Sequence, residues 1–312
     1  MCSNLINVGV FVCALIMVFA LPAVAATQTA QEQVLQITRQ ALANLQPFTA
    51  ESLHNALLAD ATSLYIVSLQ SADEYAKGHV PGAVRIQWDL ANPTTNLTGL
   101  PRDKPIVITD SNGQLSCQVA LLLCQLGYDA RSLMLGMVAW NAEYAGTGAY
   151  PGSAGLPVTN AATPLPLGDI SASQPSGLDD ASLILQRTQE YARQGRPVIV
   201  SPKAVAAMKD DALIISMQTP EDYAHGHIAG AASLPAQAFI EGSPELLRLP
   251  RDKKIVVACY IGHYSNVGAL ILNQLGYEAY SLDWGLSGWN PTAFAKPLPL
   301  FQTKNAFPVS TH

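Results

Sequence analysis

Cys259 is the residue whose type and position best suit covalent chemistry. It directly follows the apolar run 255–258 and precedes a helical pattern with Val267, Leu270 and Ile271 on one face. We therefore expect it at a strand-to-helix turn, on the sheet edge where ligands bind in open α/β folds. The converging N–H groups of such a turn create a positive potential. This potential lowers the pKa of a thiol and favours the nucleophilic thiolate.

The residues after Cys259 form the predicted binding loop, namely Tyr260, Ile261, Gly262, His263, Tyr264 and Ser265. Its amides can hold an anionic species formed after attack, either a persulfide or a thiophosphate-like adduct. Gly262 allows a positive φ and a close approach of the backbone to a ligand. Ser265 can cap the following helix or donate to bound sulfur. The side chains of Tyr260 and Tyr264 are expected to line the pocket.

The chain matches itself at an offset of 148 to 149 residues. Residues 74–83, 100–104, 125–128 and 140–141 recur as 222–231, 249–253, 274–277 and 289–290. A period this long indicates a duplicated domain rather than a solenoid repeat. We assign a first domain at 28–145, a linker at 146–178, a second domain at 179–296 and a C-terminal tail at 297–312. The linker is rich in Gly, Pro, Ala and Ser and lacks apolar periodicity.

Each unit alternates apolar runs with helical patterns. The runs 64–67, 106–108, 213–215, 255–258 and 279–282 predict buried strands. Helices are predicted over 30–45 and 179–194, and shorter ones begin at the N-caps Thr49 and Ser201. Because the runs are short and unalternating, the sequence predicts two α/β domains, each with a mostly parallel sheet covered on both faces.

The loop of the first unit differs at the reactive position. It consists of residues 110–116, with Asp110 aligned to Cys259 and Gln114 opposite His263. A carboxylate cannot accept sulfur as a persulfide, so the first unit is expected to be structural or a docking surface. His263 has two open interpretations, donor binding or proton transfer on one side and solvent exposure on the other.

Other candidate residues have structural interpretations. His79 and His227 recur before a turn and predict a shared hydrogen bond. Cys117 and Cys124 are about 10 Å apart along a helix, too far for a disulfide, and are expected in the core. Arg251, with Lys253 and Lys254, resembles residues 102–104 beside the inert loop, which favours a solvated turn.

The N-terminus predicts export. Residues 5–25 are almost wholly apolar and end in Ala23-Val24-Ala25, a signal-peptidase pattern that favours cleavage after Ala25 and a periplasmic protein. A retained anchor is the alternative, since the run is near the lower limit of roughly 17 residues for spanning a bilayer. The net charge is −6 and there are no basic clusters, so no nucleic-acid partner is expected. Association with a membrane is expected only if the N-terminal segment is retained as an anchor.

Three motifs in order resemble the rhodanese family. Residues 259–265 resemble its C-x-x-G-x-x-S/A active-site loop, 226–231 its G-H-I-P-G-A signature, and 285–289 its G-x-x-G-W. The resemblance implies a five-stranded parallel sheet flanked by helices in each domain. It also implies a Cys259 persulfide that moves a sulfane sulfur from thiosulfate, a persulfide or a polysulfide to a thiol, cyanide or a protein acceptor. No cofactor or metal is implied.

Two features depart from the family pattern. Family members usually read Asp-Val-Arg where this chain has Ser216-Met-Gln218 and, in the first unit, Ser68-Leu-Gln70. The loss of both charges bears on how the loop is braced and on binding of small anions such as thiosulfate. Two other functions stay open. A non-enzymatic sulfur carrier or docking module fits the degenerate first unit, while a Cys-dependent phosphatase would need a loop one residue longer that ends in Arg.

Overall fold

The computed structural model describes residues 28–170, 173–208, 210–296, 298 and 305–311. The predicted signal segment and its cleavage site lie outside these ranges. Within them, no helix has both the length and the apolar character needed to cross a membrane.

The first domain is built on a parallel sheet in the order β2-β1-β3-β4. Its strands are β1 (Tyr65–Ser68), β2 (Val84–Arg85), β3 (Ile106–Thr109) and β4 (Ala130–Ser132). A single parallel bridge between Phe48 and Leu133 stands where a fifth strand was expected. The helices are α1 (Ala30–Asn44), α2 (Ala50–Ala59), α3 (Ala72–Lys77), α4 (Pro93–Leu97), α5 (Gln114–Gln125) and α6 (Gly136–Trp140).

The second domain has the full five-stranded parallel sheet, in the order β6-β11-β10-β7-β9. These strands are β6 (Ile199–Val200), β7 (Ala212–Ser216), β9 (Ala232–Ser233), β10 (Lys254–Ala258) and β11 (Ala279–Leu282). The helices are α7 (Asp180–Ala192), α8 (Pro202–Met208), α9 (Pro220–His225), α10 (Ala236–Glu241), α11 (His263–Gln274) and α12 (Gly285–Trp289). The predicted α/β class and parallel sheets are confirmed.

Capping residues set the helix starts that the sequence predicted. Thr49 caps α2 in a capping box with Ser52. Ser201 accepts from the N–H of Ala204 at 3.3 Å at the start of α8. The predicted helices 30–45 and 179–194 correspond to α1 and α7, each ending one or two residues earlier than expected.

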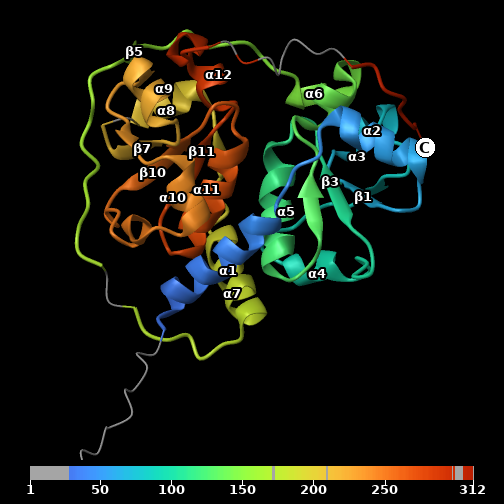
Figure 1. Ribbon diagram of the computed structural model, residues 1–312, viewed down its shortest axis with the longest axis horizontal. Helices are drawn as coiled ribbons and strands as arrows, with labels where there is room; N and C mark the ends of the chain where they lie inside the picture. Colours follow the sequence, from blue (N-terminus) through green and yellow to red (C-terminus); the bar gives the residue numbers. More distant parts are fainter. Residues whose placement is uncertain (1–27, 171–172, 209, 297, 299–304, 312) are drawn as a thin grey trace, which may run out of the picture.

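One hydrophobic core runs through both domains. It joins buried residues of α1, α5, α7 and α11 with the facing sides of both sheets. Figure 1 shows α5 and α11 side by side between the two domains, with α1 and α7 across one end of the pair. At this interface the side chains of Gln125 and Gln274 exchange two hydrogen bonds of 2.8 and 2.9 Å. Because these amides are buried, they satisfy each other and fix the relative position of the two helices.

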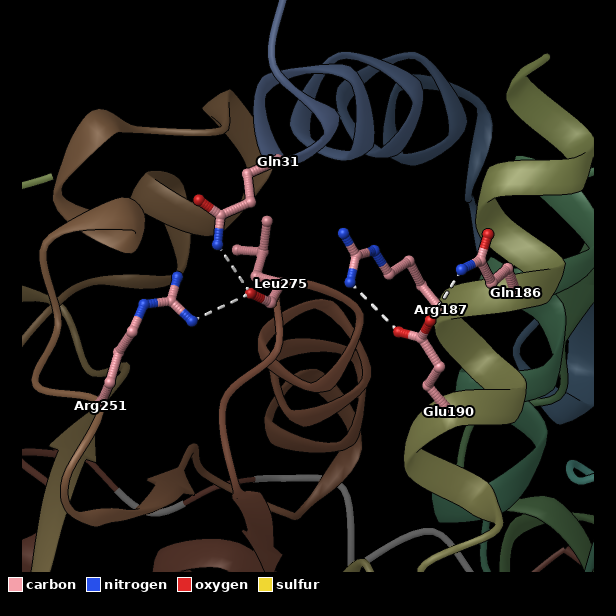
Figure 2. Close-up of polar contacts among 6 residues, drawn as sticks. All are labelled: Gln31, Gln186, Arg187, Glu190, Arg251 and Leu275. Carbon is pink, nitrogen blue, oxygen red and sulfur yellow. Dashed lines mark hydrogen bonds and ion pairs between the residues drawn. The ribbon is translucent and has the colours of Figure 1, made fainter. Parts of the chain in front are cut away.

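Helix α1 also holds the C-terminal end of α11. The carbonyl of Leu275 accepts from Gln31 of α1 at 2.9 Å and from Arg251 at 3.3 Å (Figure 2). Arg251 also lies over the ring of Tyr277. In the first domain Arg102 repeats both contacts, with the Leu126 carbonyl and the Tyr128 ring. Both arginines are exposed in a bend, as expected for a solvated turn, and each side chain also contacts the carbonyl at a helix end.

Each domain is covered by a short segment that follows the other domain. In the predicted linker, β5 (Val158–Thr159) pairs antiparallel with β8 (His227–Ile228) of the second domain. In the predicted tail, Ser310 pairs with His79 of the first domain. We call residues 154–159 and 305–311 the two straps. Figure 1 shows the C-terminal end lying against the first domain beside α2.

The two straps make equivalent contacts. The indole of Trp289 donates to the Pro157 carbonyl at 2.9 Å, and that of Trp140 donates to the Pro308 carbonyl at 2.8 Å. The side-chain amides of the asparagines that follow these tryptophans donate to the carbonyls of Leu156 and Phe307, respectively. The repeat therefore extends into the straps, at an offset slightly longer than that of the domains.

Candidate active site

Cys259 lies at the carboxyl end of β10, where the chain turns into α11, as its sequence position predicts. Its thiol is buried, at 3% exposure, and free. Sγ lies 3.4 Å from the hydroxyl of Ser265, which accepts from Ser281 at 2.9 Å and donates to the Gly262 carbonyl at 3.0 Å. Ser281 was not singled out from the sequence, although Ser132 repeats it in the first domain.

The predicted G-x-x-G-W motif supports the same turn from the side. The N–H groups of Leu286 and Ser287 donate to the carbonyls of Cys259 and Tyr260, at 2.8 and 2.9 Å. Trp284, just before the motif, has a φ of +56° although it is not glycine. Such strain persists only where the surroundings fix it. The loop after Cys259 is therefore held on a rigid base.

The loop of the first domain shows how this turn holds an anion. The buried Asp110 carboxylate accepts from the N–H groups of Gly113, Leu115 and Ser116, at 2.5, 2.9 and 3.2 Å. It also accepts from the Ser116 hydroxyl at 3.0 Å. Burial raises the pKa of Asp110, and these donors oppose that rise. A negatively chargeable side chain thus fills an amide cradle at the start of α5.

The second domain presents the same cradle around a thiol. Gly262, Tyr264 and Ser265 correspond to Gly113, Leu115 and Ser116, and both glycines begin their helices in the left-handed conformation. Within the described ranges, the N–H groups of these three residues donate to no protein acceptor. The cradle that a carboxylate fills in one domain is therefore available beside Cys259 in the other.

The two loops interlock across the domain interface. Nε2 of His263 donates to the Asn112 carbonyl at 3.0 Å. Its ring packs on Gly113, while Gln114 packs on Gly262. A side chain at either glycine would overlap its neighbour, and the positive φ would strain it further. His263 is buried, so the solvent-exposed interpretation is wrong. Burial lowers the pKa of His263 to about 4.

Gln114 completes the interlock and was recognised from the sequence only as the residue opposite His263. Its Nε2 donates to the Asp283 carboxylate at 2.8 Å, and its Oε1 accepts from the N–H of Trp284 at 3.1 Å. The first domain therefore supports the loop of the second.

A neutral pair replaces the charged residues that usually end the preceding strand. Ser216 donates to Oε1 of Gln218 at 2.8 Å, and Nε2 of Gln218 donates to the Gly226 carbonyl at 2.9 Å. Ser68 and Gln70 repeat this arrangement in the first domain. The loop is therefore braced through buried amide hydrogen bonds without a fixed charge.

A cavity of about 780 Å³ opens beside Cys259 between the two domains. The first domain contributes the end of α1, Cys117 and Met134, and the second contributes Met217, Ile240 and the loop from Cys259 to Tyr264 except Gly262. Tyr260 and Tyr264 both line it, as the sequence predicts. The hydroxyl of Tyr260 donates to Asp222 at 2.5 Å and accepts from the N–H of Thr219 at 3.2 Å.

The remaining predicted residues lie in structural roles. His227 contacts the Tyr223 carbonyl at 2.6 Å, and His79 contacts that of Tyr75 at 2.7 Å, so the shared hydrogen bond is confirmed. Cys117 is buried, and burial raises its pKa well above the usual value. Unlike a pure core residue, it also lines the cavity. Among the described residues, no group of histidines, cysteines and carboxylates could hold a metal ion.

The two parallel sheets, each with an amide-rich loop after a strand, define a pair of related α/β domains. The sequence matches the rhodanese-like domain family over residues 49–143 and 201–292, together more than half of the chain. The protein therefore belongs to the rhodanese-like family, and it has two such domains.

Individual relatives cover parts of the chain. The thiosulfate sulfurtransferase GlpE of Stutzerimonas stutzeri (strain A1501) is 32% identical over 96 residues, 30% of this chain and 84% of GlpE. A tRNA uridine(34) hydroxylase of Salmonella paratyphi B is 29% identical over 130 residues, 40% of this chain and 35% of that protein. The match to a solved thiosulfate sulfurtransferase from Pseudomonas aeruginosa covers 86% of this chain and 49% of that protein's chain, at 19% identity and a TM-score of 0.30. At the family level, the chain is thus related to sulfurtransferases.

Proposed function

We propose that the protein is an exported sulfurtransferase in which Cys259 carries a sulfane sulfur as a persulfide. The thiolate would attack the outer sulfur of a donor, whose S–S bond breaks and whose remaining part leaves with the electron pair. A thiol or cyanide would then take the outer sulfur and regenerate the thiolate. No net oxidant is needed, because sulfur moves between two carriers.

The Asp110 cradle is the observation that carries this proposal. Three N–H groups already hold a carboxyl group at the equivalent position of the first domain. The N–H groups of Gly262, Tyr264 and Ser265 would stabilise the negative charge of a Cys259 persulfide in the same way. The Ser265 hydroxyl, which accepts from the Cys259 thiol at 3.4 Å, could add a donor if its proton turned from the Gly262 carbonyl toward the persulfide. Ile261 and His263 would position the loop from the domain interface.

Persulfide formation tests the proposal directly. Protein given a sulfane-sulfur donor should gain one reducible sulfur atom, located by peptide mass spectrometry on Cys259. Cys259→Ser should gain none, and cyanide or a small thiol should remove the sulfur from the wild type. Sulfur on Cys117 or Cys124, or on no cysteine, would refute the assignment.

The same assay separates the alternatives. A carrier or docking module would accept one sulfur per chain and show no turnover with donor and acceptor both in excess. A phosphatase would hydrolyse an aryl phosphate in a Cys259-dependent manner and form no stable persulfide. The short loop without a terminal Arg favours transfer over phosphate hydrolysis.

Export is the second part of the proposal and rests on residues 5–25 alone. N-terminal sequencing of protein from its natural host should begin at Ala26. An intact Met1 in a membrane fraction would favour the retained anchor instead.

A further inference from the structure

The cavity beside Cys259 lacks the positively charged side chains that would favour an inorganic anion. Among the described residues that line it, none is Asp, Glu, Lys or Arg. Its wall is formed mainly by aliphatic, thioether and aromatic side chains, including Leu42, Met134, Met217, Ile240 and Tyr264. A doubly charged donor would lose much of its hydration here without gaining an ion pair.

Two carboxylates lie behind residues of the cavity wall. Asp222 accepts from the hydroxyl of Tyr260, which is on the wall. Asp110 lies close enough to act electrostatically on Cys117, another wall residue. The Asp222 carboxylate opposes the entry of an anion, and Asp110 adds no positive charge. The neutral pair Ser216 and Gln218 removes the cation that a family pattern would place next to the loop.

We propose that the donor for Cys259 is an organic hydropersulfide, R–S–SH, with an uncharged apolar group R that occupies the interdomain cavity. This rests on the proposed function and names its substrate class. The Cys259 thiolate bonds to the outer sulfur, the S–S bond of the donor breaks, and R–S⁻ leaves with the electron pair and then takes up a proton. A cavity of about 780 Å³ lies within the size range of pockets that hold small organic ligands.

A comparison of two donors with the same reacting group tests the proposal. Benzyl hydropersulfide and glutathione persulfide share the S–S–H group, but the second carries charges near it. The rate at which Cys259 gains sulfur from each donor is measured by mass spectrometry. It is then divided by the rate at which the same donor transfers sulfur to free N-acetylcysteine, which corrects for the intrinsic reactivity of the donor. We expect a normalised preference of about ten-fold for the benzyl donor, since its ring is buried while charges would be desolvated.

Charge variants on the wall provide the matched control. Gln46 lines the cavity from the first domain, is exposed, and lies outside the reacting loop. Gln46→Lys should raise the rate of sulfur transfer from thiosulfate several-fold and Gln46→Glu should lower it, and each should change the benzyl rate by a smaller factor. Met217→Lys should shift the donor preference further toward thiosulfate, and circular dichroism verifies that this variant folds.

The outcomes distinguish this inference from the function on which it rests. If glutathione persulfide or thiosulfate modifies Cys259 at least as well as the benzyl donor after normalisation, the apolar-donor proposal is wrong and the sulfurtransferase proposal stands. A thiosulfate rate indifferent to the charge at residue 46 would also overturn it. If no donor modifies Cys259, the proposed function itself fails.

Discussion

Asp110 and Cys259 hold the same position in the two domains, each directly after a strand and six residues before a serine that contacts its side chain. The Asp110 carboxylate lies 3.0 Å from the Ser116 hydroxyl, and the Cys259 thiol lies 3.4 Å from that of Ser265. One chain thus contains one cradle filled by a carboxyl group and one beside a free thiol.

Cys259→Asp should fold with little loss of stability, although a carboxylate buried without partners costs several kcal/mol. The N–H groups of Gly262, Tyr264 and Ser265 should receive it, as their counterparts receive Asp110. We expect the free energy of unfolding in urea to change by at most about 1 kcal/mol. Cys259→Leu, which cannot accept hydrogen bonds, is the control; a larger loss for Asp than for Leu would contradict the cradle.

Asp110→Ala should be destabilising, by about 2–4 kcal/mol, because it leaves three buried N–H groups without an acceptor. Urea denaturation measures the effect. The matched variant Cys259→Ala should cost only about 1 kcal/mol, since no N–H group depends on the thiol. Equal costs for the two variants would mean that Asp110 adds nothing to the first loop.

His263→Gln should reduce the acid sensitivity of the protein. Burial holds the pKa of His263 at about 4, whereas an unfolded histidine titrates near 6.5, so the unfolded chain binds more protons between these values. Stability that is present at neutral pH is therefore lost as pH falls from about 6.5 to 4, by at most roughly 3 kcal/mol from this residue.

Glutamine cannot titrate, and Gln114 already occupies the equivalent position in the first domain. The difference in unfolding free energy between His263→Gln and the wild type should therefore change between about pH 7 and pH 4.5. Parallel curves for the two proteins would show that His263 is accessible to protons in the folded state.

Gln125 and Gln274 should be energetically coupled across the domain interface. Each single alanine variant leaves the buried Oε1 of the other amide without its donor, while that amide keeps its Nε2 bond to a threonine. The double variant should therefore be less damaging than the sum of the two single variants. We expect a coupling of about 1–2 kcal/mol from a double-mutant cycle in urea. Additive effects would show that the two amides act independently.

Cys117→Ala and Cys124→Ala should leave sulfur transfer intact. Both belong to the domain whose loop lacks a nucleophile, and burial raises the pKa of both thiols, which disfavours the reactive thiolate. Cys117 is the stricter test because it lines the cavity with Cys259. Loss of turnover in a folded Cys117→Ala protein would show that the second thiol takes part.

Local patterns predicted β1, β3, β7, β10 and β11, the starts of four helices and the turn at Cys259, because burial and capping depend on residues near in sequence. The short strands such as β2, β4, β6 and β9 were not predicted. The contact of His263 with Asn112 could not be predicted, since it depends on how two domains dock. Gln125 and Gln274 were visible as a repeat, but a repeat does not show whether its copies touch. The straps had a signal, since Pro157-Val158 recurs as Pro308-Val309. Their composition nevertheless resembled an ordinary linker and tail.

The straps make the two halves mutually dependent. Each half receives the acceptors for its tryptophan and asparagine from the segment that follows the other half. This is the geometry of a symmetric dimer with exchanged arms, joined into a single chain. In such an arrangement the half without a cysteine in its loop is still required, because its partner would otherwise expose an indole N–H and an unpaired strand. Each half therefore depends on the other for its fold, whichever half carries a reactive group.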